Sequence, residues 1–119
     1  MNKREEGSSY ERKAQKFLEE QGFRILARNF RSRSAEIDLI AREGRYLVFV
    51  EVKERSGLRR GLGKEAVDER KQRNICEAAR WYLYRFRIPE DTPVRFDVVS
   101  IDRGRITLIR NAFPWRLTS

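Results

Sequence analysis

Two carboxylates and a lysine in the first half of the chain, Asp38, Glu51 and Lys53, are the residues best suited to catalysis. Asp38 lies in the segment AEIDLIA and the other two lie in YLVFVEVK, and both segments are typical of β-strands. Carboxylate oxygens without histidine or cysteine favour hard ions such as Mg²⁺ or Mn²⁺. A metal held there would polarise a phosphate and lower the pKa of a bound water, and the lysine could orient that water or stabilise negative charge.

The first of these segments predicts a strand with one charged and one apolar face. Side chains alternate between the two faces of a strand, so Asp38 shares its face with Glu36. The opposite face is expected to carry Ile37, Leu39 and Ala41.

The two strands are expected to form a hairpin that brings Asp38 and Glu51 to the same side of the sheet. A loop of two or of four residues gives the same parity. With a two-residue loop the side chains are directly opposite, about 4.5–5.5 Å apart, or diagonal, about 7–8 Å apart. A charged strand end can also be plain solvated surface, with Lys53 paired to Glu51 or Glu36. Strand parity and the basic flanks favour the metal site.

Basic segments flank the hairpin at its open end. Residues 28–34 precede the first strand and residues 54–64 follow the second, so both lie near the carboxylates. Guanidinium and ammonium groups bind phosphates. The candidate nucleic-acid-binding residues are Arg31, Arg33, Arg55, Arg59, Arg60, Lys64 and Lys71.

The overall charge also points to a polyanionic partner. Lys and Arg number 27 against 18 Asp and Glu, which gives a formal charge of +9 and a pI near 10.3. This balance favours a nucleic acid over a membrane surface or an acidic protein. With no histidine and one cysteine, the chain excludes a zinc finger, a Ser-His-Asp triad and a Cys-His protease.

The periodicity predicts an α/β fold with the element order α-β-β-β-α-β-β and a mixed central sheet flanked by helices. A length of 119 residues fits one domain, with residues 1–7 as a flexible tail and residues 111–119 as a C-terminal tail. No apolar signal region is visible at the N-terminus, which predicts a cytoplasmic protein. The expected helices span residues 8–21 and 64–85. The expected strands span residues 23–28, 35–41, 46–53, 94–101 and 106–110.

Several segments together resemble a known family. They are YERKA at residues 10–14, ILARNFR at 25–31, EIDLI at 36–40, FVEVK at 49–53, AV at 66–67, KQR at 71–73 and RFDVV at 95–99. In these segments the chain resembles the YraN-like family of small bacterial predicted endonucleases. Asp38 and the Glu51-to-Lys53 tripeptide also look like the PD-(D/E)xK motif of the restriction-endonuclease-like superfamily.

The resemblance implies an α-β-β-β-α-β core and Mg²⁺-dependent nuclease chemistry on DNA, with a plan similar to archaeal Holliday junction resolvases. It implies that Asp38, Glu51 and the Val52 carbonyl bind the metal, that Glu11 completes the metal shell, and that Lys53 is the catalytic lysine. A nucleic-acid-binding module on the same fold, with little or no catalysis, is the alternative. Two-strand cleavage needs two sites, so a homodimer is compatible with this interpretation.

Other residues allow two interpretations. Glu11 is also favoured near a helix start by the dipole, and Lys71 can extend to solvent or reach the site. Glu36 is expected to pair with an arginine more than to bind metal, and Asp97 is expected to form an ion pair. The aromatic helix end can pack in the core or in a dimer, or stack on bases; its members are Trp81, Tyr82, Tyr84 and Phe86.

Overall fold

The computed structural model describes residues 3–55 and 67–116, with side chains from residue 9 to 54 and from 67 to 116. Its elements follow the predicted order and form the predicted α/β fold. They are α1 (Lys3–Glu20), β1 (Arg24–Arg31), β2 (Glu36–Glu43), β3 (Tyr46–Arg55), α2 (Glu69–Arg85), β4 (Val94–Asp102) and β5 (Arg105–Ile109). Among the described residues, no helix is long and apolar enough to cross a membrane.

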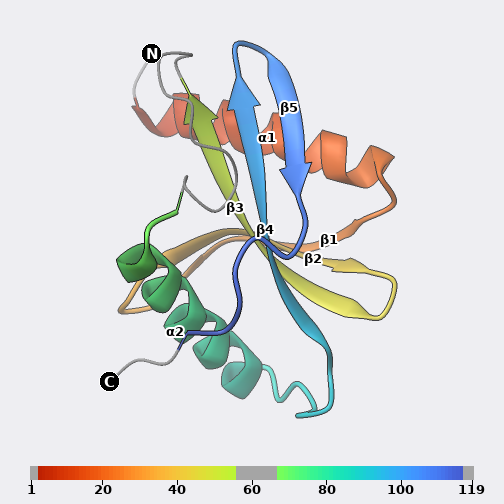
Figure 1. Ribbon diagram of the computed structural model, residues 1–119, viewed down its shortest axis with the longest axis vertical. Coiled ribbons are helices and arrows are strands. Elements are labelled where there is room, and N and C mark those ends of the chain that lie inside the picture. Colours follow the sequence, from red (N-terminus) through yellow and green to blue (C-terminus); the bar gives the residue numbers. More distant parts are fainter. Residues whose placement is uncertain (1–2, 56–66, 117–119) are drawn as a thin grey trace.

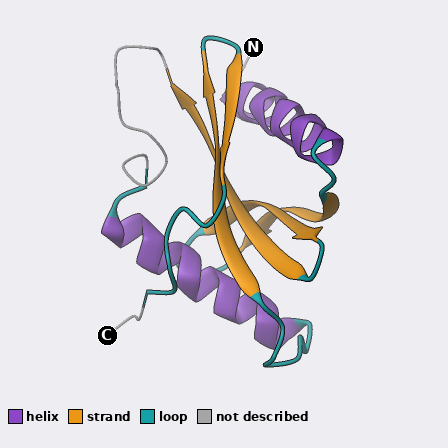
Figure 2. Ribbon diagram, turned by 45° about the vertical axis from the view of Figure 1, so that its right-hand side comes forward, coloured by secondary structure: helices purple, strands orange, loops and turns teal. Residues whose placement is uncertain are grey.

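The five strands form one mixed sheet in the order β1-β2-β3-β4-β5. Strands β3 and β4 are parallel and every other neighbouring pair is antiparallel. A parallel pair needs a crossover connection, and α2 lies in the segment that joins β3 to β4. The sheet is strongly twisted, and the two helices cover its opposite faces (Figures 1 and 2).

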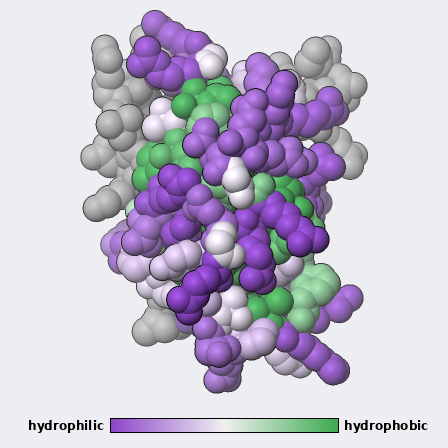
Figure 3. Space-filling view, turned by 90° about the vertical axis from the view of Figure 1, so that its right-hand side faces the viewer, coloured by the Kyte–Doolittle hydropathy of each residue, from purple (hydrophilic) through white to green (hydrophobic). Residues whose placement is uncertain are grey.

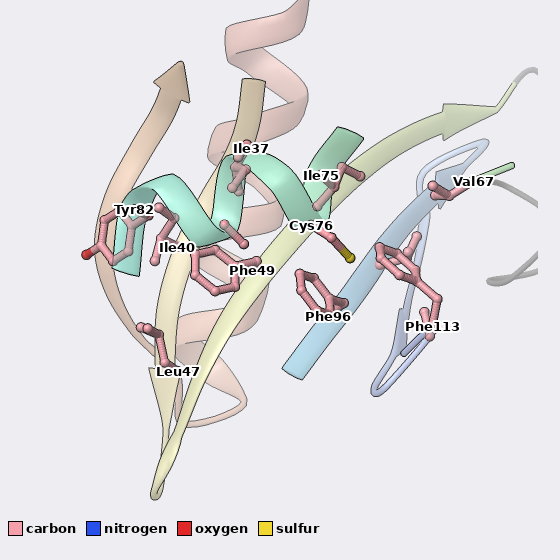
Figure 4. Close-up of a cluster of buried hydrophobic side chains, with 14 residues drawn as sticks. Ile37, Ile40, Leu47, Phe49, Val67, Ile75, Cys76, Tyr82, Phe96 and Phe113 are labelled. Atoms are coloured by element: carbon pink, nitrogen blue, oxygen red, sulfur yellow. The ribbon is translucent and has the colours of Figure 1, made fainter. Parts of the chain in front are cut away.

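Each face of the sheet has its own apolar core. On the α1 side, Ala14 and Leu18 pack against residues such as Val48 and Val50. On the α2 side, the core includes Ile75, Cys76, Tyr82, Phe49 and Phe96, which lie between the helix and the strands (Figure 4). Hydrophilic side chains dominate the outer face shown in Figure 3, with hydrophobic patches between them.

Phe49→Ala is expected to cost about 3–5 kcal/mol of unfolding free energy, because removing a buried aromatic ring leaves a cavity. Phe49 is 1% exposed, and its ring centroid lies 5.7 Å from those of both Tyr82 and Phe96. Urea unfolding followed by circular dichroism measures the loss. The control is Tyr84→Ala, whose side chain is 76% exposed and should cost little. Equal losses for the two variants would contradict the assigned core.

An ion network joins β2, β4 and Arg110, which follows β5, near the turn between β2 and β3. Arg95 contacts Glu43 and Asp97, which confirms the expected ion pair of Asp97, and Arg110 contacts Glu43 at 2.6 Å. The hydrogen bonds from Arg110 and then Arg95 lower the pKa of Glu43 to about 2.

The helix starts differ from the predictions. The second helix begins at Glu69, because the Asp68 side chain accepts a hydrogen bond from the Lys71 amide at 2.8 Å and caps the helix. Residues 64–66 of the predicted helix lie outside the described residues. The first helix begins at Lys3, five residues before the predicted start at residue 8. Lys3 to Glu6 are good helix formers, which extends the helix into the predicted tail.

The first two strands also differ from their predicted form. Strand β1 runs on to Arg31, and residues 32–35 make the turn, in which Ser32 Oγ accepts hydrogen bonds from the amides of Ser34 and Ala35. In β2, Ile37 packs on the α2 side together with Ile40, and not with Leu39 and Ala41. The strict alternation therefore breaks next to Asp38.

Candidate metal centre

The candidate site lies where β2 and β3 separate. The two strands are joined by a two-residue turn and pair from Glu43 with Tyr46 to Leu39 with Val50. Beyond this last pair, the Asp38 carboxylate Oδ2 accepts the Val52 amide hydrogen at 2.8 Å. The Val52 amide therefore donates to the Asp38 side chain and not to a backbone carbonyl of β2. Figure 1 shows the β1–β2 hairpin turning aside here while β3 and β4 continue together.

Three carboxylates from two elements come together at this point. Oxygens of Glu11 on α1 and of Glu36 and Asp38 on β2 all lie within 4.8 Å of one another. The Asn29 amide connects two of them, since its Nδ2 donates to Glu11 at 2.8 Å and to Glu36 at 3.0 Å. Asn29 has a φ of 53°, in the left-handed region that asparagine tolerates better than most residues. The backbone of β1 is thus shaped to carry this bridging amide.

Asp38 is the most electrostatically strained of the acids. Burial raises its pKa to about 8, helped by the charge of Glu51, by a hydrogen bond with the Glu51 carboxyl and by the charge of Glu11. The Val52 amide acts in the opposite direction but does not outweigh these causes. A carboxyl group held near other carboxylates binds a proton or a cation to relieve the repulsion.

Two lysines approach Glu51, which is 6% exposed. The Nζ of Lys53 lies 3.4 Å from Glu51 Oε2, and the Nζ of Lys71 on α2 lies 3.7 Å from the same oxygen. A buried carboxylate is costly unless it is paired, and these two ammonium groups supply the pairing. One end of the site is therefore acidic and the other end is cationic.

The family of the chain follows from comparison with known sequences. Residues 10–101, a range that includes all four acids of the site, match the Uncharacterised protein family UPF0102. The chain belongs to the UPF0102 family. A UPF0102 protein of Lachnoclostridium phytofermentans is 52% identical over 113 residues, which cover 95% of this chain and 96% of that protein. UPF0102 proteins of Symbiobacterium thermophilum and Legionella pneumophila are 50% and 42% identical, and the matches cover 90% and 92% of this chain and 94% of each relative.

In this UPF0102 chain, the residues singled out from the sequence form two connected groups. Asp38 lies with Glu11 in the acidic group and is hydrogen-bonded to Glu51, and Glu51 in turn contacts Lys53 and Lys71. Two further residues lie at this site. Asn29 was not a candidate from the sequence, and Glu36 was expected to pair with an arginine more than to bind metal. Glu36 does pair with Arg31, at 2.9 Å, as expected, yet it also joins the acidic group. The position of Asn29 inside the alternating segment of β1 was the signal in the sequence that could have identified it as a site residue.

The basic residues expected to bind nucleic acid lie in different elements of the structure, and some lie outside its described residues. Arg31 belongs to β1 and not to a loop, and Arg33 lies in the turn that follows it. Arg55 ends β3, and its side chain lies outside the described residues. Three others lie wholly outside them: Arg59, Arg60 and Lys64.

Proposed function

We propose that this UPF0102 protein is a metal-dependent endonuclease that hydrolyses phosphodiester bonds in DNA in the cytoplasm, on a fold of the PD-(D/E)xK superfamily. The observation that carries the proposal is the meeting of Asp38 and Glu51 at the separation of β2 and β3, with Lys53 beside them. A module that only binds DNA has no need for close carboxylates where phosphates must approach, because they repel the ligand.

The donor set fits a hard divalent cation. Asp38, Glu51 and Glu11 offer carboxylate oxygens, which suit Mg²⁺ or Mn²⁺. The raised pKa of Asp38 supports the fit, because the group already needs a positive partner. The Val52 carbonyl is proposed as a further ligand. In an extended strand the amide and carbonyl of one residue point to the same side, and the Val52 amide points to Asp38.

A bound Mg²⁺ or Mn²⁺ would polarise the phosphate and lower the pKa of a water. The protein residues hold and complement this arrangement. Lys53 is about one-third exposed, so its ammonium group can turn from Glu51 to a phosphate and stabilise charge that develops there. The Asn29 amide holds the carboxylates of Glu11 and Glu36 in place.

The DNA partner is supported by the charge of +9. Branched or junction DNA is the proposed substrate, because the resemblance to junction resolvases points to it and the described residues show no element that reads bases. A panel of branched, duplex and single-stranded DNA with Mg²⁺ and with Mn²⁺ tests the function. We expect cleavage that EDTA abolishes. DNA retention without any cleavage, even at millimolar Mn²⁺, would favour the binding module instead.

Lys53→Met is expected to lower kcat by about 100-fold or more, as for the loss of one group that stabilises transition-state charge. Lys71→Met should instead raise KM, since Lys71 is proposed to bind DNA phosphate in both ground and transition states. Steady-state cleavage of a fluorescent substrate separates the two effects. Binding of Mn²⁺, followed by calorimetry, should persist in both variants. A Lys53→Met variant with unchanged kcat would remove Lys53 from the proposed mechanism.

A further inference from the structure

An aromatic groove lies between the β1–β2 turn and α2. It is lined by Ser32, Arg33 and Ser34 on one side and by Glu77, Arg80, Trp81 and Tyr84 on the other, and it encloses about 770 Å³. A second hollow of about 810 Å³ adjoins it across Arg80 and Tyr84 and reaches Trp115. The two hollows share these residues and so form one continuous surface.

Two exposed rings line the groove without contributing to the core. Trp81 is 47% exposed and Tyr84 is 76% exposed, whereas their neighbour Tyr82 is buried against Phe49. The Trp81 and Tyr84 rings stack on each other, with centroids 5.6 Å apart and an angle of 29° between their planes. Large rings left in solvent on a helix surface are typical of a binding site.

The charge along this surface suits a polyanion. The lining of the two hollows includes four arginines and only two carboxylates, those of Glu77 and Glu90. The arginines are Arg33, Arg80, Arg85 and Arg87. Within the part of the chain that the structure describes, none of the four arginines forms an ion pair with a carboxylate. A second copy of this chain would bring like charges together here, whereas a nucleic acid would neutralise them.

We propose that the aromatic groove binds a single-stranded segment of nucleic acid, with bases stacked on Trp81 and Tyr84 and phosphates held by Arg33 and Arg80. Flat rings flanked by cations suit single strands, because every unpaired base has a face that can stack. A duplex keeps its bases stacked internally and cannot use these rings.

The groove is placed to extend the candidate metal centre. Ser34 in its wall is two residues from Glu36, and Trp81 lies ten residues along α2 from Lys71, about 15 Å at the helical rise. One strand can therefore cross from the groove to the acids. This part of the inference rests on the proposed function, and it specifies substrates that carry a single-stranded arm next to the cleaved bond. Binding of the strand by the groove does not depend on cleavage.

Trp81 fluorescence tests the inference directly. The chain has two tryptophans, so the full-length Trp115→Phe variant reports on Trp81 alone. With EDTA present to prevent cleavage, oligo(dT) should quench this fluorescence, and duplex DNA at equal phosphate concentration should quench it much less. Fluorescence anisotropy of labelled oligo(dT) should show that Trp81→Ala and Tyr84→Ala each weaken binding about 5- to 100-fold. The matched control is Leu26→Ala with Tyr46→Ala, which removes exposed apolar groups elsewhere and should change little.

Three results would overturn the inference. They are unchanged Trp81 fluorescence with oligo(dT), unchanged affinity in the folded Trp81→Ala/Tyr84→Ala variant, and a sedimenting dimer that this variant converts to a monomer. The last result would make the groove an interface between copies. If DNA is cleaved but the groove variants bind normally, the groove inference fails alone. If oligo(dT) binds the groove but no DNA is ever cleaved, the proposed function fails alone.

Discussion

Replacing Asp38 or Glu51 with alanine should lower the rate of DNA cleavage by more than about 100-fold and leave DNA binding intact. Even groups outside the metal shell cost about 10- to 100-fold, and these two are proposed as ligands themselves. Affinity for DNA should hold or rise slightly, because a negative charge next to the phosphates is lost. Gel-based cleavage with Mg²⁺ and retardation with EDTA measure the two properties separately.

The matched control is Glu54→Ala, which removes an exposed carboxylate from the same strand three residues beyond Glu51. It should cleave DNA at the rate of the unaltered protein. Circular dichroism should show the same helix content for all three variants, since Asp38 and Glu51 lie outside the apolar cores. Cleavage at the normal rate by the Asp38 and Glu51 variants would remove both residues from the active site.

Without metal, the protein should lose stability as the pH rises from about 4 to about 8. The pKa of Asp38 is about 8 in the folded chain against an ordinary 3.8, so the folded state keeps a proton that the unfolded chain has released. Stability falls with pH wherever the folded state holds more protons. The loss should be about 2–5 kcal/mol.

Asp38→Asn should remove this pH dependence and raise the melting temperature of the metal-free protein at pH 8, with little change at pH 5. An amide can accept the Val52 hydrogen bond through its oxygen and donate to Glu51 without adding charge. Thermal unfolding in EDTA at both pH values measures the effect. A variant less stable than the parent at pH 8 would show that Asp38 carries no such strain. Added Mn²⁺ should stabilise the parent most at high pH, because Asp38 must release its proton to bind a metal.

Local patterns were enough to predict the hairpin that carries Asp38 and Glu51. The alternation of YLVFVEVK and the two-residue turn after Glu43 predict that these residues are close, although strict alternation does not hold in β2 next to Asp38. The same patterns predicted the element order, because each strand carries its own apolar run. These inferences needed no knowledge of distant contacts.

Other features depend on contacts that one segment cannot reveal. Asn29 reaches the site only because β1 pairs with β2 through Phe30 and Ile37, a register that the turn at Ser32 sets. Ile37 changes face because β2 leaves β3 at that point, so a strict period of two misplaces it. The aromatic helix end likewise divides between core and solvent according to what α2 meets: Tyr82 faces Phe49, and Trp81 faces outward.

A crystal grown with Mn²⁺ and measured at the manganese absorption edge tests the central claim most directly. The account predicts one anomalous peak within about 2.5 Å of carboxylate oxygens from both Asp38 and Glu51. A peak held by Glu11 and Glu36 without Glu51, or no peak at saturating Mn²⁺, would contradict it.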